Sequence, residues 1–441
     1  MSENMLDTAK EAIRLATQKG AAGVGAVAEV RREVGVAWRD GKLEKITEAT
    51  TRGLSLRLYV DGRYASVSTS DLRKDALGEF IDNAIALTRT LTPDPHRALP
   101  DPALYQGQAR LDLELEDPRH GEVSAVERRK KAQAVEEGAR SVKGAEAIIS
   151  VTTNFQDVSS ERFQLHSNGF EGAQRATEYS VWAEVTVRDP AGRRPEDWAD
   201  ATVRRFSDLP DVGAIGREAT ERTLGAIGAK KIGSAVMAVA VDNRVAGNLF
   251  RRMGGALTGM ALQQKRSFLE GKLGKPIGSK LLTVDDDPLL ARGLGSRLFD
   301  SEGIAAKRRP IFEAGVLRGY FIDTYYGKKL GMAPTTGGPS NGAWKLGTKS
   351  QAELLADMKN GILVTGFLGG NSNDTTGDFS LGIRGFAVRN GKIAEPIAEM
   401  NLSGNHLETW KKLAAVGNDP YLSSTLRTPT LVFDGLQIAG T

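Results

Sequence analysis

One short motif in this sequence matches the pattern around a hydrolytic nucleophile. The stretch "GPSNG", residues 338–342, fits G-x-S-x-G, in which a serine on a sharp turn attacks a carbonyl carbon. An acidic residue followed by His406 would complete the Ser, Asp, His order of a hydrolase triad around Ser340. Such a serine lies between a strand and a helix, whereas a long loop precedes Ser340 and no helix start follows it. A stand-alone serine hydrolase that uses Ser340 is therefore an alternative interpretation and not the leading one.

Metal ligands are sparse in the sequence. The absence of cysteine excludes thiolate nucleophiles and cysteine-bound zinc. The common helical zinc motif needs two histidines one turn apart, because only that spacing aims both imidazoles at one ion. The four histidines are far apart in the sequence: His96, His120, His166 and His406. We expect each of them to be structural, although a site assembled from distant segments would leave no sequence signature.

The composition is typical of a soluble globular protein. Hydrophobic residues make up 40% and charged residues 26% of the 441 residues, and no apolar run approaches the roughly 18 residues that a membrane span requires. The net charge is only +4, and basic pairs such as Arg193-Arg194 lack neighbouring aromatics, which disfavours nucleic-acid binding. The first residues carry Glu3, Asp7 and Glu11, unlike a signal peptide, so we expect a cytoplasmic protein.

Turn signals place antiparallel strands on both sides of three dipeptides. Asp40-Gly41 and Asp61-Gly62 each separate two extended runs, and Asn390-Gly391 does so near the C-terminus. Asp-Gly and Asn-Gly favour the positive φ angles that a two-residue hairpin turn demands. The sequence therefore predicts two successive hairpins near the N-terminus and one near the C-terminus.

A proline-rich segment and a capping pattern separate these strands from the middle of the chain. Residues 91–102 contain four prolines and predict a linker, because proline forbids both helix interior and central strand. Ser124 and Glu127 form a capping-box pattern that predicts a helix start. The basic run at residues 128–131 then falls in that helix, where we interpret it as a solvated face.

These patterns predict an α+β fold in three regions. Residues 1–105 are expected to form an N-terminal domain of helices on an antiparallel sheet, and residues 106–232 a middle α+β region with a second antiparallel sheet. A helix from about Pro210 to Gly228 closes the middle region, since proline suits a first helical turn. Residues 233–441 are expected to form a β-rich C-terminal domain.

Six motifs of the C-terminal half occur in an order that resembles a known family. They are "DDDP", "FDSEGIAAKRRPIFEAGVLRGYFIDTYYGKKLG", "GGPSNGAW", "TGDFSLGIRGFAVRNGKI", "NLSGN" and "VGND". The chain resembles the TldD/TldE family, also called PmbA, whose members mature microcins. The resemblance covers essentially the whole chain. It implies a cytoplasmic heterodimer that cleaves unfolded or extended peptides, with roles in peptide maturation and antitoxin degradation.

The resemblance also implies a division of labour between two subunits. TldD-type chains bind zinc through a His-Glu-x-x-x-His helix and a cysteine near the C-terminus, whereas TldE-type chains do not. In this sequence the corresponding stretch, residues 243–269, contains no histidine, and the tail contains no cysteine. The chain is therefore similar to the TldE-type subunit, and we expect no cofactor in this chain and zinc in a TldD-like partner. A homodimeric, non-catalytic peptide-binding protein is a second alternative.

No catalytic or metal-binding residue is predicted in this chain. The asparagines and aspartates of residues 371–378 lack a histidine or lysine neighbour that would make one of them a poised acid or base, so a bend rich in turns is the better interpretation. We expect this bend and "GGPSNGAW" to face an internal cavity and to contact the peptide or the partner. The residues predicted for that contact are Asn341, Trp344, Asn371, Asn373, Asp378 and Arg384.

Overall fold

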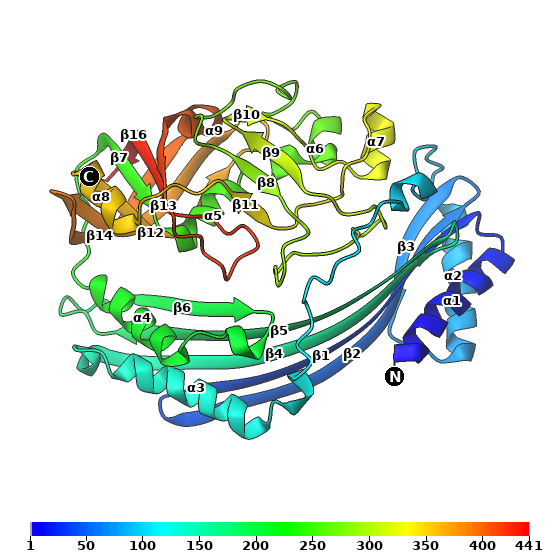
Figure 1. The fold of residues 1–441 in the computed structure, drawn as a ribbon, viewed down its shortest axis with the longest axis horizontal. Coiled ribbons are helices and arrows are strands. Elements are labelled where there is room, and N and C mark those ends of the chain that lie inside the picture. Colours follow the sequence, from blue (N-terminus) through cyan, green and yellow to red (C-terminus); the bar gives the residue numbers. More distant parts are fainter. Residues whose placement is uncertain (1, 441) are drawn as a thin grey trace.

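The computed structural model describes residues 2–440 (Figure 1). A long six-stranded sheet, in the order β3-β2-β1-β4-β5-β6, runs along one side of the molecule, and the C-terminal domain lies over it. Its strands are β1 (Gly23–Arg39), β2 (Lys42–Val60), β3 (Arg63–Thr69), β4 (Ile148–His166), β5 (Phe170–Val187) and β6 (Glu196–Val203). Helices segregate from largely antiparallel strands, which confirms the predicted α+β class.

The three predicted hairpin turns are confirmed. Asp40-Gly41 joins β1 to β2, and Asp61-Gly62 joins β2 to β3. Asn390-Gly391 joins β13 (Asp378–Arg389) to β14 (Lys392–Asn405). In each pair both residues have positive φ, from 46° at Asp40 to 79° at Gly41, as a two-residue hairpin turn of this kind requires.

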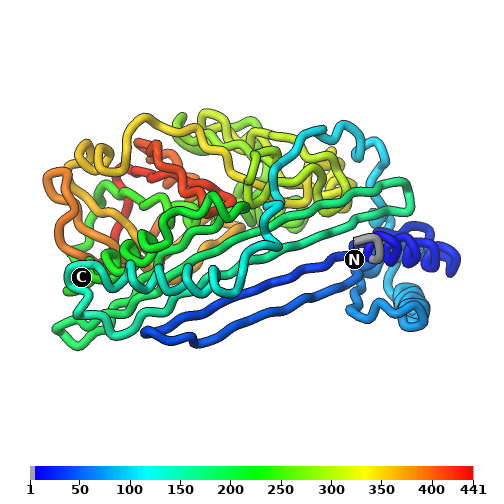
Figure 2. The backbone as a smooth tube through the Cα atoms, turned by 60° about the horizontal axis from the view of Figure 1, so that its bottom comes forward, coloured from blue at the N-terminus to red at the C-terminus, as the bar shows by residue number. Residues whose placement is uncertain are grey.

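The prediction of a separate second sheet in the middle region is wrong. Strands β4, β5 and β6 extend the N-terminal sheet, because β1 pairs with β2 on one edge and with β4 on the other, from Gly25↔His166 to Arg39↔Thr152. Figure 2 shows β1 and β2 running most of the length of the molecule. Because these strands are so long, a separate pair of helices can pack on each end of the same sheet.

Four helices cover one face of this sheet. Helices α1 (Ser2–Gln18) and α2 (Lys74–Thr90) share a buried core with β1, β2 and the end of β4, including Phe163. Helices α3 (Ala125–Arg140) and α4 (Val212–Gly225) share another with the start of β4, β5 and β6, including Phe155. Phe155 and Phe163 lie an even number of residues apart on β4, so both helical pairs pack on the same face. We call the opposite face of the sheet the inner face.

Helix α3 begins at the predicted capping box, but one residue of its basic run is buried. Ser124 Oγ accepts from Glu127 N, and the Glu127 carboxylate accepts from Ser124 N. Arg128 is only 5% exposed, and its Nη2 donates to Asp157 Oδ1 at 3.0 Å. The interpretation of this run as a solvated face is therefore wrong for Arg128, because its side chain points at β4 and pairs with the carboxylate of Asp157 there.

The C-terminal domain is built on a sheet that closes on itself. Its strands run β14-β13-β12-β7-β16-β15, and β14 also pairs with β16. The remaining strands of this sheet are β7 (Ala235–Val241), β12 (Gly361–Ser372), β15 (Leu413–Val416) and β16 (Leu431–Ala439). A smaller sheet, β10-β9-β8-β11, packs beside it, with β8 (Val284–Asp286), β9 (Arg309–Glu313), β10 (Val316–Leu317) and β11 (Gly342–Trp344).

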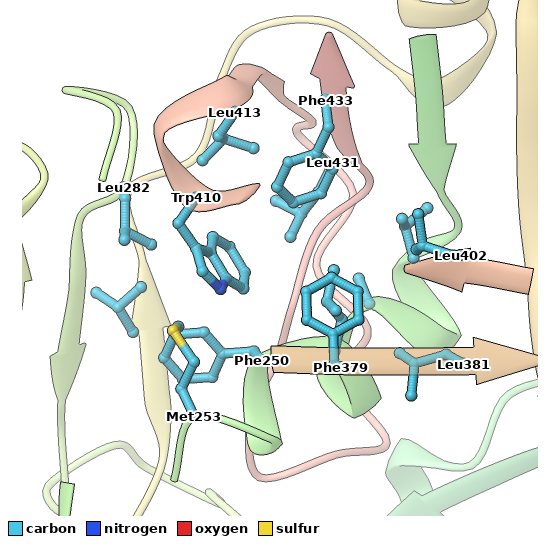
Figure 3. Packing of buried hydrophobic residues seen from close by; sticks show 14 of the residues in the cluster. Phe250, Met253, Leu282, Phe379, Leu381, Leu402, Trp410, Leu413, Leu431 and Phe433 are labelled. Atoms are coloured by element: carbon cyan, nitrogen blue, oxygen red, sulfur yellow. The ribbon is translucent and has the colours of Figure 1, made fainter. Parts of the chain in front are cut away.

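The interior of this domain is the largest apolar core of the molecule, and Trp410 lies at its centre with no exposed surface (Figure 3). Phe250, Met253, Leu413 and Phe433 surround the indole. The helices of the domain are α5 (Asn243–Arg251), α6 (Gly259–Gln263), α7 (Thr324–Leu330), α8 (Gln351–Met358) and α9 (His406–Thr409).

Candidate functional site

Helix α5 occupies the stretch in which the resemblance places zinc ligands, and its inward side is apolar. Asp242 caps the helix by accepting from Arg244 N at 3.0 Å. Phe250 is 8% exposed, and its ring centroid lies 5.0 Å from that of Trp344 and 5.8 Å from that of Trp410. Both contacts are edge-to-face, the geometry that aromatic pairs prefer. Aromatic rings therefore fill the space next to α5.

The histidine and carboxylate side chains of residues 2–440 are scattered over the fold. Within residues 2–440, no group of three or more His, Asp or Glu side chains is arranged to hold a metal. His120 Nε2 lies 2.8 Å from Asp157 Oδ1, and His166 Nδ1 lies 2.9 Å from the Tyr105 hydroxyl. The two imidazoles thus lie on different elements, neither belongs to a group of three donors, and Phe250 offers no donor atom at α5.

Ser340 is held by a carboxylate and not by a histidine. It is 4% exposed, and its backbone N and its Oγ donate to Asp286 Oδ1 at 2.5 and 2.7 Å. Burial raises the pKa of Asp286, and the bonds from Ser340 oppose that shift. In the described part of the chain no histidine lies within hydrogen-bonding distance of Ser340. The structure therefore does not bring Ser340 and His406 together as a triad.

Asn341 and Trp344 lie in the interior. Asn341 has no exposed surface, and its Nδ2 donates to Asp287 O at 2.8 Å while its Oδ1 accepts from Gly295 N at 2.8 Å. Trp344 is 8% exposed, and its Nε1 donates to Leu426 O at 3.0 Å. Both side chains tie loops of the C-terminal domain to one another.

The asparagine-rich bend forms the exposed connection between β12 and β13. Asn373 Oδ1 accepts from Thr375 N at 2.9 Å, the side-chain turn that asparagine favours, and Asn371 lies on β12 opposite Ser380. Asp378 accepts from Asn405 Nδ2 at 2.8 Å, and this bond lowers the pKa of its carboxyl. The expectation of a turn-dense bend is confirmed, and these side chains lie at the surface.

Arg384 lies apart from the other predicted contact residues, at the junction with the middle region. Its Nη1 donates to Glu196 O at 2.6 Å, and its Nη2 pairs with Asp197 Oδ1 at 2.9 Å. A cavity of about 300 Å³ opens beside it, with Arg193, Arg194 and Arg222 among its lining residues. Arg384 therefore joins β13 to the segment that starts β6.

The inner face of the six-stranded sheet is polar and faces the C-terminal domain. Gln164 Nε2 on β4 donates to Ser301 O at 3.0 Å, and Arg57 Nη1 on β2 donates to the same oxygen at 3.0 Å. At the other end of the sheet, Arg244 of α5 pairs with Asp200 at 3.5 Å and lies 4.9 Å from the ring centroid of Trp198. Trp198 is 45% exposed.

Sequence analysis did not find this face. Its residues come from six strands that only the fold brings together, and alternation within each strand was the one signal of which side they share.

Known proteins are similar to this chain over nearly its whole length. Three domain families match in order: PmbA/TldA metallopeptidase domain 1 at residues 25–88, the central domain at 118–227 and the C-terminal domain at 234–440. The metalloprotease PmbA of Escherichia coli O157:H7 is 30% identical over 92% of this chain and 90% of its own length. The chain belongs to the PmbA/TldD family of metallopeptidases. A PmbA homologue of Haemophilus influenzae is 29% identical over 97% of this chain and 94% of its own length.

Solved structures of similar proteins share the fold. A crystal structure from Bacteroides thetaiotaomicron, whose name suggests a modulator of DNA gyrase, is 41% identical, covers 99% of this chain and 98% of its own, and superposes with a TM-score of 0.95. TldE of Thermococcus kodakarensis is 19% identical, covers 98% of this chain and 100% of its own, and has a TM-score of 0.84, a likeness of fold alone. Among the described residues of this PmbA/TldD chain, no helix is long and apolar enough to cross a membrane.

Proposed function

We propose that this chain is the subunit without zinc of a TldD/TldE-type heterodimeric peptidase, and that it holds unfolded or extended peptides for a zinc-bearing TldD-like partner. The observation that supports this most is the aromatic packing of α5, where Phe250 faces Trp344 and Trp410. Zinc hydrolysis needs nitrogen, oxygen or sulfur donors around an open coordination position. A phenyl ring and two indoles, whose N–H groups only donate, cannot supply them, so we assign the zinc chemistry to the partner.

The chain offers two features that suit a peptide-holding role. Strand β12 pairs with β7 only from Ile362 to Val364, so within residues 2–440 one edge of β12 beyond Thr365 has no strand partner. Leu368 on that edge is 54% exposed. An extended peptide can add to such an edge through backbone hydrogen bonds, with side-chain contacts giving preference among sequences.

The inner face of the sheet is the second feature. It presents Trp198, which is 45% exposed, beside the ion pair of Asp200 with the largely buried Arg244 of α5, where a bound chain would pass from the sheet to the C-terminal domain. Zinc in the partner would supply an activated water. The residues of this chain would bind the peptide, fix its direction and keep bulk water from part of its length.

The family resemblance also suggests biological roles for the proposed complex. Peptide-antibiotic maturation and antitoxin degradation are the roles that it implies, and the cytoplasm is where such a complex would act. Without the partner, two copies of this chain could pair with each other.

Reconstitution tests the proposal directly. The chain is purified alone without chelator, its zinc content is measured, and it is mixed with a subunit that carries His-Glu-x-x-x-His, using an unfolded peptide as substrate. We expect near-zero zinc in this chain, no cleavage by either subunit alone, and cleavage by the mixture.

Two results would overturn this assignment. Stoichiometric zinc bound to this chain would mean that distant side chains assemble a site. Capture of peptide without any cleavage in the mixture would favour the homodimeric binding protein.

A further inference from the structure

A second cavity lies at the opposite end of the inner face from α5. It measures about 260 Å³ and is lined by β1, β2, β3 and β4 together with Ser301 of the C-terminal domain. Its charged lining residues are Glu29, Arg57 and Arg162. A neighbouring cavity of about 340 Å³ shares Arg162 and Ser301 with it, so the two lie in series between the sheet and the C-terminal domain.

Neither arginine in this cavity has a carboxylate partner. Arg57 Nη1 donates to Ser301 O, and Arg162 Nη2 donates to Gln164 Oε1 at 3.2 Å. In the part of the chain that the structure describes, no carboxylate oxygen lies within 4.0 Å of either guanidinium. Nε of Arg162 is buried without any hydrogen-bond partner. Two like charges thus share one small, partly buried space with spare donor capacity, and only Glu29, at more than 4.0 Å, offsets them, which favours the binding of a further anion.

The surrounding groups favour an anion as well. Ser55 and Ser66 line the cavity, and within residues 2–440 neither hydroxyl has a hydrogen-bond partner. Burial and the charge of Arg57 lower the pKa of His166 to about 4, so the ring adds no positive charge near pH 7. Burial also lowers the pKa of Arg162, with Glu29 opposing and Arg57 adding to that shift.

Glu29 is the one acidic group in the lining. It lies directly opposite Arg162 in the β1–β4 register, yet their charged atoms are more than 4.0 Å apart. Glu29 leaves a net charge of +1 on the cavity and would repel an anion bound to the arginines. Its removal is therefore a sensitive test of what the cavity binds.

We propose that this cavity binds a carboxylate, and specifically the free C-terminus of a peptide held on the inner face. Bidentate guanidinium contacts match the planar carboxylate, and the hydroxyls of Ser55 and Ser66 can donate to it. This inference rests on the proposed peptide-holding role. It adds that the chain recognises the C-terminal carboxylate of the peptide as well as the peptide backbone.

The register of the sheet sets the span of such a peptide. Arg162 and Asn154 are both inner-face residues of β4. The ladder continues from Asn154 through Trp182 on β5 to Asp200 on β6, which pairs with Arg244 of α5. Eight residues of strand extend roughly 26 Å at about 3.3 Å each. A peptide of about eight extended residues would reach from the cavity to α5.

Anisotropy titrations on the full chain test this inference with two probes. They are an N-terminally labelled, unstructured octapeptide with a free C-terminus and the same peptide amidated. We expect the free acid to bind about tenfold tighter or more than the amide, as for a lost charge-assisted hydrogen bond. Arg162→Gln should abolish this difference, and Glu29→Gln should enlarge it. Arg175→Gln, at an exposed arginine of β5 that pairs with Glu161 at 2.7 Å, is the matched control and should leave the difference unchanged.

Each contrary result has a distinct meaning. Equal binding of acid and amide to the wild-type chain overturns the carboxylate site and leaves peptide holding intact. An unchanged difference in both Arg162→Gln and Glu29→Gln places the carboxylate elsewhere and also overturns it. If neither peptide binds, the holding role fails, and sodium acetate alone decides the site. Acetate should then raise the melting temperature of the wild type but not of Arg162→Gln, and the absence of this contrast contradicts the inference.

Discussion

The Ser372 hydroxyl lies 3.1 Å from Nε2 of His406, where the end of β12 meets the start of α9. The imidazole has no exposed surface, and it stacks on Phe268 with ring centroids 5.6 Å apart. Its Nδ1 is buried without a hydrogen-bond partner. A histidine that served as a catalytic base would have that nitrogen oriented by an acceptor. The contact is therefore structural, and the ring is held neutral in an apolar setting.

The neutral state of His406 predicts acid sensitivity. Burial, with a smaller contribution from Arg252, lowers the pKa of His406 to about 4. Its pKa in the unfolded chain is about 6.5. Between these values the unfolded state binds more protons than the folded state, so stability falls as the pH drops from about 6.5 to about 4. The loss from this one group reaches about 3 kcal/mol at the acid end of that window.

The phenylalanine variant isolates this contribution. His406→Phe keeps an aromatic ring against Phe268, and urea unfolding at several pH values should show a shallower loss of free energy below pH 6.5 than in the wild type. His166→Phe should remove a comparable share, because burial also lowers the pKa of His166 to about 4. Identical slopes for the wild type and His406→Phe would contradict a neutral buried imidazole.

Glycines set how closely α3 and α4 approach each other. A Cβ at Gly216 of α4 would lie 1.9 Å from Val135 O of α3, whereas a Cβ at Gly78 of α2 would meet nothing within 4 Å. We expect Gly216→Ala to cost about 3 kcal/mol, because backbone atoms must move apart. Gly78→Ala is the matched control and should stabilise the chain by about 1 kcal/mol, the gain of alanine in a helix. Chemical denaturation measures both, and equal effects would contradict the close approach.

Local signals in the sequence were reliable where the structure depends on neighbours in the chain. The turns at Asp40-Gly41 and Asn390-Gly391 and the Ser124 capping box form as predicted, because each involves a few consecutive residues. The joining of two expected sheets into one was not predictable. It depends on β1 pairing with β4, whose partners Gly25 and His166 are far apart in sequence.

Sequence reasoning about the site had a similar limit. It could note that residues 243–269 lack histidine, but it could not show that Phe250 meets Trp344 and Trp410. The proposed carboxylate cavity was also invisible, because Glu29, Arg57 and Arg162 lie on three strands and carry no motif. Charge that is unpaired in space has no signature along the chain.

Ser340 should be inert as a nucleophile. Its Oγ donates to Asp286, so a fluorophosphonate probe is expected to leave the chain unlabelled near pH 7. Ser340→Ala removes one of two donors from a buried carboxylate and should lower the free energy of unfolding by about 1 to 3 kcal/mol. Ser372→Ala is the matched control, because Ser372 is the serine that does contact a histidine, and it should also remain unlabelled. Stoichiometric labelling that disappears in Ser340→Ala would restore the serine hydrolase interpretation.

Arg384 should couple the C-terminal domain to the middle region. It pairs with Asp197, which is only 5% exposed, and donates to Glu196 O, so Arg384→Ala leaves that carboxylate with the more distant Arg222 at 3.6 Å. We expect a loss of about 2 kcal/mol and faster hydrogen exchange in residues 195–198. Arg389→Ala, which removes an exposed pair with Glu395, is the control and should change neither quantity measurably.

Arg384→Ala and Asp378→Ala test whether this junction and the bend near Asp378 contribute to the proposed complex. Asp378→Ala removes the acceptor for Asn405 Nδ2 at the surface and should cost little stability. If the bend and the junction contact the peptide or the partner, Arg384→Ala and Asp378→Ala should each weaken assembly with the zinc-bearing subunit or slow peptide cleavage, whereas Arg389→Ala should not. Size-exclusion chromatography of the mixture and a cleavage assay measure both effects. Normal assembly and normal cleavage in both variants would remove these residues from the contact surface and leave Arg384 with a purely structural role.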